Sequence, residues 1–283
     1  MIMKYANMHL HSTYSDAQFT PEQLVLIGKS LGYKAMALTD HETDGGVKKF
    51  MSYAKKEGIR TVSGVEFYGK EFGINFHLAA LDYDMDNPGI REFIQKRCDL
   101  HMEHTRKCFQ QGIDSGFLEG MTWDDIMELT PPGAWMCIDS VMNVMRIKRI
   151  VPDDYDFDTF RRVLFKSDFA KSCRVTPPTA EEVIKVVRGA GGVVALAHPN
   201  AAWLEHIDTL VGYGLNGIEI SHPSMRDRSP ALARQAAEAY NLYHCGGTDH
   251  TGPMGGNEGN LACPVFNGIT EEEYFDLVER RRG

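Results

Sequence analysis

Tyr5-Ala-Asn-Met-His9-Leu-His11-Ser-Thr-Tyr-Ser-Asp16 is the stretch of this chain from which both its fold and its chemistry are predicted. Residues 5–10 have the pattern of a β-strand, and side chains alternate along a strand, so His9 and His11 share one face while Met8 and Leu10 share the other. Imidazole nitrogens are good donors for Zn, Mn and Fe, and this spacing points both rings the same way. The pair predicts a metal site, with two hydrogen-bonded or surface histidines as the alternative.

The same combination of an apolar strand-like segment and a terminal His, Asp or Glu recurs along the chain. The segments end at Asp40 and His41, at Glu66, at His77, at His198, at His222, and at Asp249 and His250. Helical patterns separate them at the spacing of βα units: residues 20–32, which begin with Thr20 as N-cap, residues 45–58, which end at Gly58, and residues 178–188, 206–214 and 230–240. Residues at the ends of successive strands are how an α/β barrel builds a site at its rim, so we expect an α/β fold of this kind.

Residues 88–176 interrupt this alternation. Their patterns predict helices over residues 90–117, 123–129, 139–150 and 157–165. We therefore expect a barrel built from residues 1–87 and 177–283, and a mostly helical insertion, residues 88–176, that caps the active site.

Composition limits the classes of partner. With 30 basic and 39 acidic residues the formal net charge is −9, which disfavours an extended nucleic-acid surface because such surfaces need clustered Lys and Arg. The six cysteines form no C-x-x-C motif, as is typical of a reducing cytosol, and no apolar run of 18 residues suggests a membrane span. The sequence favours a cytoplasmic protein that does not bind membranes, and it leaves the oligomeric state open.

Six ordered motifs resemble those of the PHP (polymerase and histidinol phosphatase) family of metal-dependent phosphoesterases. They are His9-x-His11-x4-Asp16, Thr39-Asp40-His41, Gly64-Val65-Glu66, His77-Leu78, Ala197-His198-Pro199 and Gly247-Thr248-Asp249-His250. The resemblance covers nearly the whole chain outside the insertion. It implies a distorted (β/α)7 TIM-like barrel of the PHP type that holds two or three divalent metal ions.

Carried over residue by residue, the resemblance also implies a ligand set. The first metal would be held by His9, His11, Glu66 and Asp249, the second by the bridging Glu66 with His77 and His198, and the third by Asp16, His41 and the last histidine. In the commoner family ending, one residue separates the Asp from that histidine, whereas here His250 follows Asp249 directly and Thr251 stands in its place. Strand alternation would point His250 away from Asp249 unless a bulge or turn re-aims it.

The donor types indicate the metal and the reaction. Mixed His and carboxylate donors suit Mn²⁺, which we favour, or Fe²⁺ or Zn²⁺, better than Mg²⁺ or Ca²⁺. Two bridged ions can generate a hydroxide that attacks phosphorus, and a nearby imidazole can protonate the leaving alkoxide. We assign catalytic roles to Asp249, His222 and His250.

Other residues are expected to support the site. Arg226, Arg146 and His222 are candidates for substrate binding, and Asp40 is expected to orient a neighbouring imidazole from behind the ligands. Three further histidines lie in helical patterns and are expected on solvated faces: His101, His104 and His206.

The resulting functional prediction is a phosphoesterase that hydrolyses small phosphomonoesters or cyclic phosphodiesters of sugars or nucleotides and releases phosphate. An amidohydrolase-type enzyme that cleaves C–N bonds is one alternative, although no Lys ends a strand to bridge its metals. A non-catalytic PHP module is the other.

Overall fold

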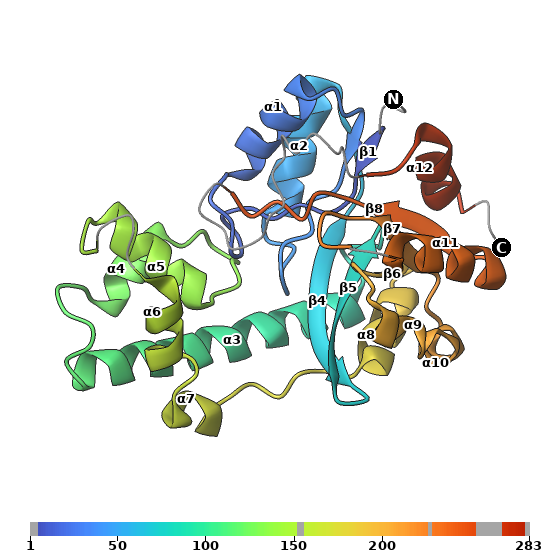
Figure 1. Ribbon diagram of the computed structural model, residues 1–283. Coiled ribbons are helices and arrows are strands. Elements are labelled where there is room, and N and C mark those ends of the chain that lie inside the picture. Colours follow the sequence, from blue (N-terminus) through green and yellow to red (C-terminus); the bar gives the residue numbers. More distant parts are fainter. Residues whose placement is uncertain (1–4, 152–155, 226–227, 253–267, 281–283) are drawn as a thin grey trace.

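Two β-sheets form the centre of the computed structural model, which describes residues 5–151, 156–225, 228–252 and 268–280 (Figure 1). The smaller sheet is parallel, with the order β1 (Ala6–Asn7), β2 (Ala35–Met36) and β3 (Arg60–Thr61). The larger sheet has the order β4 (Gly64–Glu71), β5 (Ile74–Leu81), β6 (Val193–Leu196), β7 (Gly217–Ser221) and β8 (Tyr243–Gly246). β5 is antiparallel to both β4 and β6, whereas β6, β7 and β8 run parallel to one another.

The predicted α/β class is confirmed, but a closed (β/α)7 barrel is not detected in the described part of the chain. One reason is the turn at Phe72 and Gly73, where φ is 50° and 78°. Positive φ at both central residues is typical of a two-residue hairpin turn, so β5 returns directly along β4 with no helix between them. Isolated bridges, from Leu10 to His250 and from His41 to Glu66, link the two sheets.

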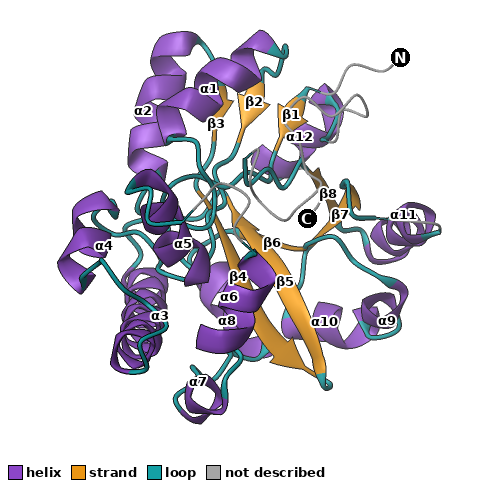
Figure 2. Ribbon diagram, turned by 60° about the vertical axis from the view of Figure 1, so that its left-hand side comes forward, coloured by secondary structure: helices purple, strands orange, loops and turns teal. Residues whose placement is uncertain are grey.

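Most of the helices flanking the sheets begin and end near their predicted positions. Thr20 caps α1 (Pro21–Ser30) through a reciprocal bond with Gln23, and Gly58, with φ of 75°, ends α2 (Val47–Glu57). The predicted patterns also yield α8 (Ala180–Gly189), α10 (Ile207–Tyr213) and α11 (Ser229–Tyr240), while α9 (Ala201–Leu204) and α12 (Glu271–Val278) were not predicted. Figure 2 shows these helices around the outside of the strands.

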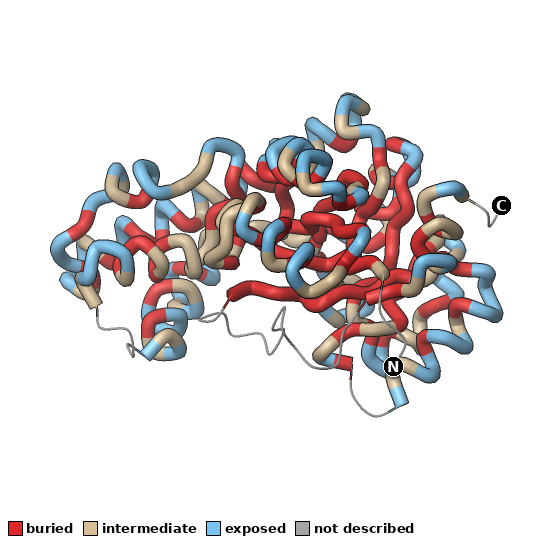
Figure 3. The backbone as a smooth tube through the Cα atoms, turned by 90° about the horizontal axis from the view of Figure 1, so that it is seen from above, coloured by how far each residue is buried: buried red, intermediate tan, exposed pale blue. Residues whose placement is uncertain are grey.

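The described part of residues 88–176, which we call the insertion, is mostly helical and has an apolar core of its own, while its role as a cap over the active site stays a prediction. It contains α3 (Pro88–Asp114), α4 (Trp123–Leu129), α5 (Ile138–Ile147), α6 (Phe157–Leu164) and α7 (Asp168–Ser172). Phe109, Met136 and Phe160 are buried within it. Figure 3 shows buried backbone concentrated in the strands, with a smaller buried region in these helices. No helix in the described ranges combines the length and the apolar character needed to cross a bilayer.

Candidate metal centre

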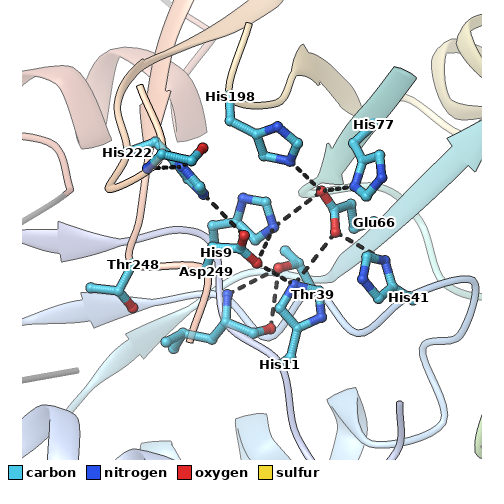
Figure 4. Close-up of polar contacts among 12 residues, drawn as sticks. His9, His11, Thr39, His41, Glu66, His77, His198, His222, Thr248 and Asp249 are labelled. Carbon is cyan, nitrogen blue, oxygen red and sulfur yellow. Dashed lines mark hydrogen bonds and ion pairs between the residues drawn. The ribbon is translucent and has the colours of Figure 1, made fainter. Parts of the chain in front are cut away.

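Glu66, on β4, lies at the centre of the cluster drawn in Figure 4. Its Oε1 lies 3.2 Å from His9 Nε2, 3.0 Å from His77 Nδ1 and 3.4 Å from His198 Nε2. Its Oε2 lies 3.4 Å from His11 Nε2 and 3.0 Å from His41 Nδ1. Because each oxygen faces a different group of imidazoles, this buried carboxylate has the geometry to bridge two cations.

Asp249 and Asp16 place two more carboxylates at the edges of the cluster. Asp249 Oδ1 lies 2.9 Å from His11 Nε2 and 3.5 Å from His9 Nε2, and Oδ2 lies 3.3 Å from His222 Nε2. Asp16 lies 3.6 Å from both His11 Nδ1 and His41 Nε2. Donor atoms of His9, His11, Glu66 and Asp249 converge within 4.8 Å of one another, as do those of His11, Asp16 and His41.

Nine of the predicted site residues therefore lie together in space: His9, His11, Asp16, His41, Glu66, His77, His198, His222 and Asp249. One of them, His77, occupies a position in its strand that the sequence did not predict. His77 lies in the middle of β5, opposite Tyr68 on β4, and not at a strand end. Its ring still reaches Glu66, because residues 66 and 77 lie on adjacent antiparallel strands.

His250 is placed differently from these nine residues. The backbone of Asp249 is left-handed, with φ of 48°, and the His250 ring stacks on Phe19 with a centroid separation of 5.4 Å. The backbone carbonyl of His250 accepts a hydrogen bond from His11 N. A role for His250 as a metal ligand or catalyst stays a prediction.

The predicted substrate-binding arginines lie away from the ligand cluster or outside the described ranges. Arg146 belongs to α5 of the insertion and lines a cavity whose wall includes Ser15 and Trp135. Arg226 lies outside the described residues. The third candidate, His222, is in the cluster, and its Nδ1 accepts a hydrogen bond from Ser224 N at 3.1 Å.

Asp40 supports the site in a way that the sequence did not indicate. Its Oδ1 accepts hydrogen bonds from Ser12 N and Ser15 Oγ, and its Oδ2 accepts one from Ser12 Oγ, each at 2.6 Å. We predicted an imidazole partner, but the buried carboxylate instead holds the turn that leads from His11 to Asp16. The serine donors are nearer to Asp40 than any ring nitrogen is, so Asp40 holds this loop in place and does not orient an imidazole directly.

Glu219 is a residue of the cluster that the sequence reasoning missed. It is fully buried on β7, and its Oε1 lies 2.8 Å from His9 Nδ1. Its Oε2 accepts a hydrogen bond of 2.6 Å from the backbone N of His198, where φ is 32°. A carboxylate bonded to one ring nitrogen fixes the tautomer and leaves the other nitrogen for a metal. The available signal was an acidic residue inside the otherwise apolar strand Gly217–Ser221.

Gly247 allows the chain after β8 to pass against His9. A Cβ atom added at Gly247 would lie 2.4 Å from His9 N and 2.7 Å from Asn7 Oδ1. Real Cβ atoms do not approach backbone so closely, so a side chain here would displace His9 from its position beside Glu66.

Without a cation, two imidazoles and two carboxylates of the cluster, those of His9, His41, Glu66 and Asp249, favour each other's charged forms. Burial by itself lowers the pKa of His9, but Glu66, Glu219 and Asp249 outweigh it and raise the pKa well above the ordinary value. Burial is likewise outweighed at His41, whose pKa rises to about 10 beside Glu66 and Asp16. The pKa values of Glu66 and Asp249 are well below their usual range because the imidazoles overcome the effect of burial.

The donor atoms fit divalent cations. His9 Nε2, both ring nitrogens of His11, His41 Nδ1 and Glu66 Oε2 are buried and make no hydrogen bond. Leaving several buried polar atoms without a hydrogen bond in one place is costly, and a bound cation would satisfy them together. Imidazole and carboxylate ligands are the set that Mn, Fe and Zn accept.

A second buried network joins the insertion to β4, and it corrects the expectation that His101 faces solvent. Arg97 Nε donates to Glu42 Oε2 at 2.5 Å, and His101 Nε2 lies 2.8 Å from Tyr68 Oη and 3.0 Å from an Arg97 nitrogen. His101 is only 6% exposed, because Tyr68 and Trp135 cover its ring. His104 is also partly buried, with Nδ1 3.0 Å from the carbonyl oxygen of Cys173.

A family model described as the PHP domain matches residues 7–164, more than half of the chain and most of the insertion. The buried cluster of His and carboxylate side chains between the two sheets is consistent with that match. The chain belongs to the PHP domain family.

Curated relatives align over almost the whole chain. A 5'-3' exoribonuclease of Haemophilus influenzae is 28% identical over 268 residues, which is 90% of this chain and 92% of the relative. A phosphoribosyl 1,2-cyclic phosphate 1,2-diphosphodiesterase of Eggerthella lenta is 27% identical over 88% of this chain and 95% of its own. A 3',5'-nucleoside bisphosphate phosphatase of Chromobacterium violaceum is 25% identical, and the alignment covers 89% of this chain and 88% of the relative.

A solved structure has a similar fold over the full length. It is a candidate metal-dependent phosphoesterase from Bifidobacterium adolescentis, with a TM-score of 0.80 and 21% identity, and the match covers 98% of this chain and 96% of the other. The overall arrangement, residues 88–176 included, is thus shared with that solved structure.

Proposed function

We propose that this protein is a metal-dependent phosphoesterase that hydrolyses small phosphomonoesters or cyclic phosphodiesters of sugars or nucleotides, with release of phosphate. The observation that carries this proposal is the position of Glu66, whose two oxygens face two groups of imidazoles. The relatives named as a diphosphodiesterase and a bisphosphate phosphatase support the reaction class.

The proposed ligands are assigned from the distances above. His9, His11, Glu66 and Asp249 would hold one ion, and Glu66 with His77 and His198 a second. Asp16 and His41, with His11, would hold a third. Mn²⁺, Fe²⁺ or Zn²⁺ bound there would lower the pKa of a water molecule and neutralise charge on the phosphoryl oxygens.

His222 is the residue that we propose as the proton donor to the leaving alkoxide. Its Nδ1 accepts the backbone N–H of Ser224, so in the neutral ring the proton lies on Nε2. Nε2 is directed toward Asp249 at the cluster, 3.3 Å from Oδ2. An imidazole that is held in one tautomer beside the metal ligands can deliver that proton without rotating.

The main competing substrate is RNA. It is favoured by one observation, the 28% identity to an exoribonuclease over nearly the full length of both chains. A small substrate is favoured by the net charge of −9, because polymer binding depends on clustered basic residues. We favour the small substrate, and a cytoplasmic location in keeping with the dispersed cysteines.

A substrate panel tests the proposal. Purified protein loaded with Mn²⁺, Fe²⁺ or Zn²⁺ is assayed for phosphate release from nucleoside monophosphates, bisphosphates and cyclic sugar phosphates, and for shortening of 5'-phosphorylated RNA. Glu66→Gln serves as the inactive control and Glu272→Gln, on an exposed part of α12, as the matched charge control.

We expect turnover of small esters that falls at least about a hundredfold in Glu66→Gln and is retained in Glu272→Gln. Degradation of long RNA without turnover of any small ester would contradict the small substrate and show that the protein is an exoribonuclease. Hydrolysis of neither class by the metal-loaded protein would contradict a phosphoesterase function.

A further inference from the structure

A cavity of about 260 Å³ lies between the loop after His11 and helix α5 of the insertion. The loop contributes Thr13, Ser15 and Gln18, and α5 contributes Ser140, Asn143 and Arg146. Enclosed sites for whole drug-sized ligands have volumes of roughly 300–1,000 Å³, so this cavity suits one end of a substrate.

The cavity adjoins the proposed metal centre. Ser15 and Ala17 both line it, and they flank Asp16, whose carboxylate lies 3.6 Å from His11 and His41. Trp135 forms another wall, and its ring centroid lies 5.5 Å from that of His41. A molecule attacked at the metal centre could therefore extend between Asp16 and Trp135 into the cavity.

Arg146 gives the cavity its chemical character. Its Nε is buried without a hydrogen-bond partner, and no carboxylate in the described ranges pairs with the guanidinium, although the chain has nine more acidic than basic residues. A buried unpaired donor on a cation is costly unless a ligand satisfies it. The planar guanidinium fork matches the oxygens of a phosphate.

We propose that Arg146 binds a second phosphate of the substrate, the one that is not hydrolysed, while the first is attacked beside Glu66. This rests on the proposed function and narrows the substrate to a sugar or nucleotide that carries two phosphoryl groups. The names of two relatives fit this chemistry, because a phosphoribosyl cyclic phosphate and a nucleoside bisphosphate each carry two.

The test compares substrates that differ only in the second phosphate. Adenosine 3',5'-bisphosphate is compared with adenosine 3'-monophosphate and 5'-monophosphate for wild type, Arg146→Gln and Arg162→Gln. Arg162, exposed on α6, matches the change in charge and side-chain type. Arg146→Gln should lower kcat/KM for the bisphosphate at least about tenfold, the scale of one charge-assisted hydrogen bond. Its kcat/KM for the two monophosphates should equal that of wild type, and Arg162→Gln should match wild type on all three substrates.

An equal loss on all three substrates, or no loss on the bisphosphate, would overturn the assignment of Arg146 while leaving the phosphoesterase function intact. If wild type hydrolyses none of these three nucleotides, the substrate panel above decides the proposed function, and calorimetric binding of the bisphosphate to metal-free protein decides the cavity alone. Weaker binding in Arg146→Gln supports the site, and equal binding contradicts it.

A separate group of donor atoms lies within the insertion. His104 and Cys108 are one turn apart on α3, and Cys173 directly follows α7. His104 Nε2 lies 3.7 Å from Cys108 Sγ, and His104 Nδ1 lies 3.6 Å from Cys173 Sγ. One donor atom from each of the three residues falls within 4.8 Å of the others.

The geometry fits a tetrahedral thiophilic ion. With Zn–N and Zn–S bonds of about 2.0 and 2.3 Å, a nitrogen and a sulfur ligand lie roughly 3.5 Å apart, close to the 3.7 Å between His104 Nε2 and Cys108 Sγ. His104 Nδ1 lies 3.0 Å from the carbonyl oxygen of Cys173. Because a carbonyl oxygen only accepts, Nδ1 carries the proton of the neutral ring, and Nε2 is left to bind a metal. Cys108 is fully buried, and His104 and Cys173 are partly exposed, which leaves access for an ion and a water ligand.

We infer that His104, Cys108 and Cys173 bind a zinc-like divalent ion that ties α7 to α3. This site is independent of the phosphoesterase proposal. A Co²⁺ titration tests it, because thiolate ligands give a near-ultraviolet charge-transfer band that His and carboxylate ligands at Glu66 cannot give.

Wild type and Cys98→Ser, which changes a buried cysteine elsewhere on α3, should both show the band, and the Cys108→Ser/Cys173→Ser double variant should lose it. The double variant should also bind about one ion fewer per chain by elemental analysis. Absence of the band in reduced wild type, or a Cys108–Cys173 disulfide in protein purified without reductant and free of this ion, would overturn the site.

Discussion

One carboxylate, Glu219, sets the orientation of two proposed ligands. It holds the ring of His9 through Nδ1 and the backbone of His198 through its N–H. His198 has a left-handed backbone, with φ of 32°, a conformation that costs energy for a non-glycine residue. The hydrogen bond of 2.6 Å from Glu219 offsets part of that cost and keeps His198 directed at Glu66.

Glu219→Gln tests this positioning role. The amide retains the shape but loses the negative charge that favours the Nδ1–H tautomer of His9, so metal affinity should fall about 10- to 100-fold. Metal affinity is measured by competition with a chelator, and far-ultraviolet circular dichroism checks the fold. Restoration of activity by excess Mn²⁺ is expected, because the direct ligands remain. Unchanged affinity would mean that Glu219 only fills space in β7.

Substitution of His250 tests whether this residue is a metal ligand or a packing residue. Its ring is buried against Phe19, and we expect His250→Ala to lower the melting temperature while leaving the metal content intact. Thr251→Ala, at the adjacent buried position, is the matched control and should have a smaller effect. Elemental analysis and thermal unfolding decide between the roles: loss of about one ion per chain together with activity would instead make His250 a ligand of the third ion.

At the scale of elements, the insertion meets β4 through a buried polar network and not through apolar contacts alone. Glu42 accepts hydrogen bonds from Arg97 Nε and Tyr68 N, and His101 joins Tyr68 to Arg97. Burial first, and then the Arg97 charge, lower the pKa of His101 to about 3. The ring is therefore neutral in the folded protein above that pH.

This network predicts a defined acid sensitivity. Between pH 3 and the unfolded pKa of about 6.5, the unfolded chain binds one more proton at His101 than the folded chain, so the free energy of unfolding rises with pH. The slope from one proton is about 1.4 kcal/mol per pH unit. His101→Gln should remove it, as measured by urea unfolding between pH 4.5 and 6.5 with chelator present. His206→Gln, on α10's partly exposed N-cap, is the control, and equal slopes in all three proteins would contradict the prediction.

The elements also show where sequence reasoning succeeded and where it stopped. Local signals, such as Thr20 as N-cap and Gly58 as the end of a helix, predicted helix ends well because they act within one turn. The turn at Phe72 and Gly73 was missed, so the hairpin that places His77 in mid-strand was missed too. Periodicity indicates which face of an element is apolar, but not which partner covers it. The burial of His101 and the contact of Glu219 depend on distant segments and could not be read from it.

At the scale of the whole molecule, the cluster joins segments that span nearly the entire chain. His9 and His11 follow β1, His41 follows β2, and Glu66 and His77 belong to β4 and β5. His198 follows β6 and Asp249 follows β8. The two sheets are connected at this place by isolated bridges, one of which pairs His41 with Glu66. A cation bound here would therefore cross-link both sheets, so its removal should be felt by the fold and not only by the site.

Metal removal should consequently lower the melting temperature. An ion present at about a hundred times its Kd stabilises the folded state by about 2.7 kcal/mol, which corresponds to roughly 5 to 10 °C for a chain of this size. Protons compete with the ion, since the pKa of His41 is raised to about 10 and that of His9 is raised as well, so metal affinity and the shift should both grow from pH 6 to pH 8. Differential scanning fluorimetry of chelated and Mn²⁺-loaded protein at the two pH values measures both effects, and Glu66→Gln should lose most of the shift. The prediction is contradicted if wild type has the same melting temperature with and without metal and Glu66→Gln has that temperature too. The ion pairs of the cluster would then hold the two sheets together without a cation.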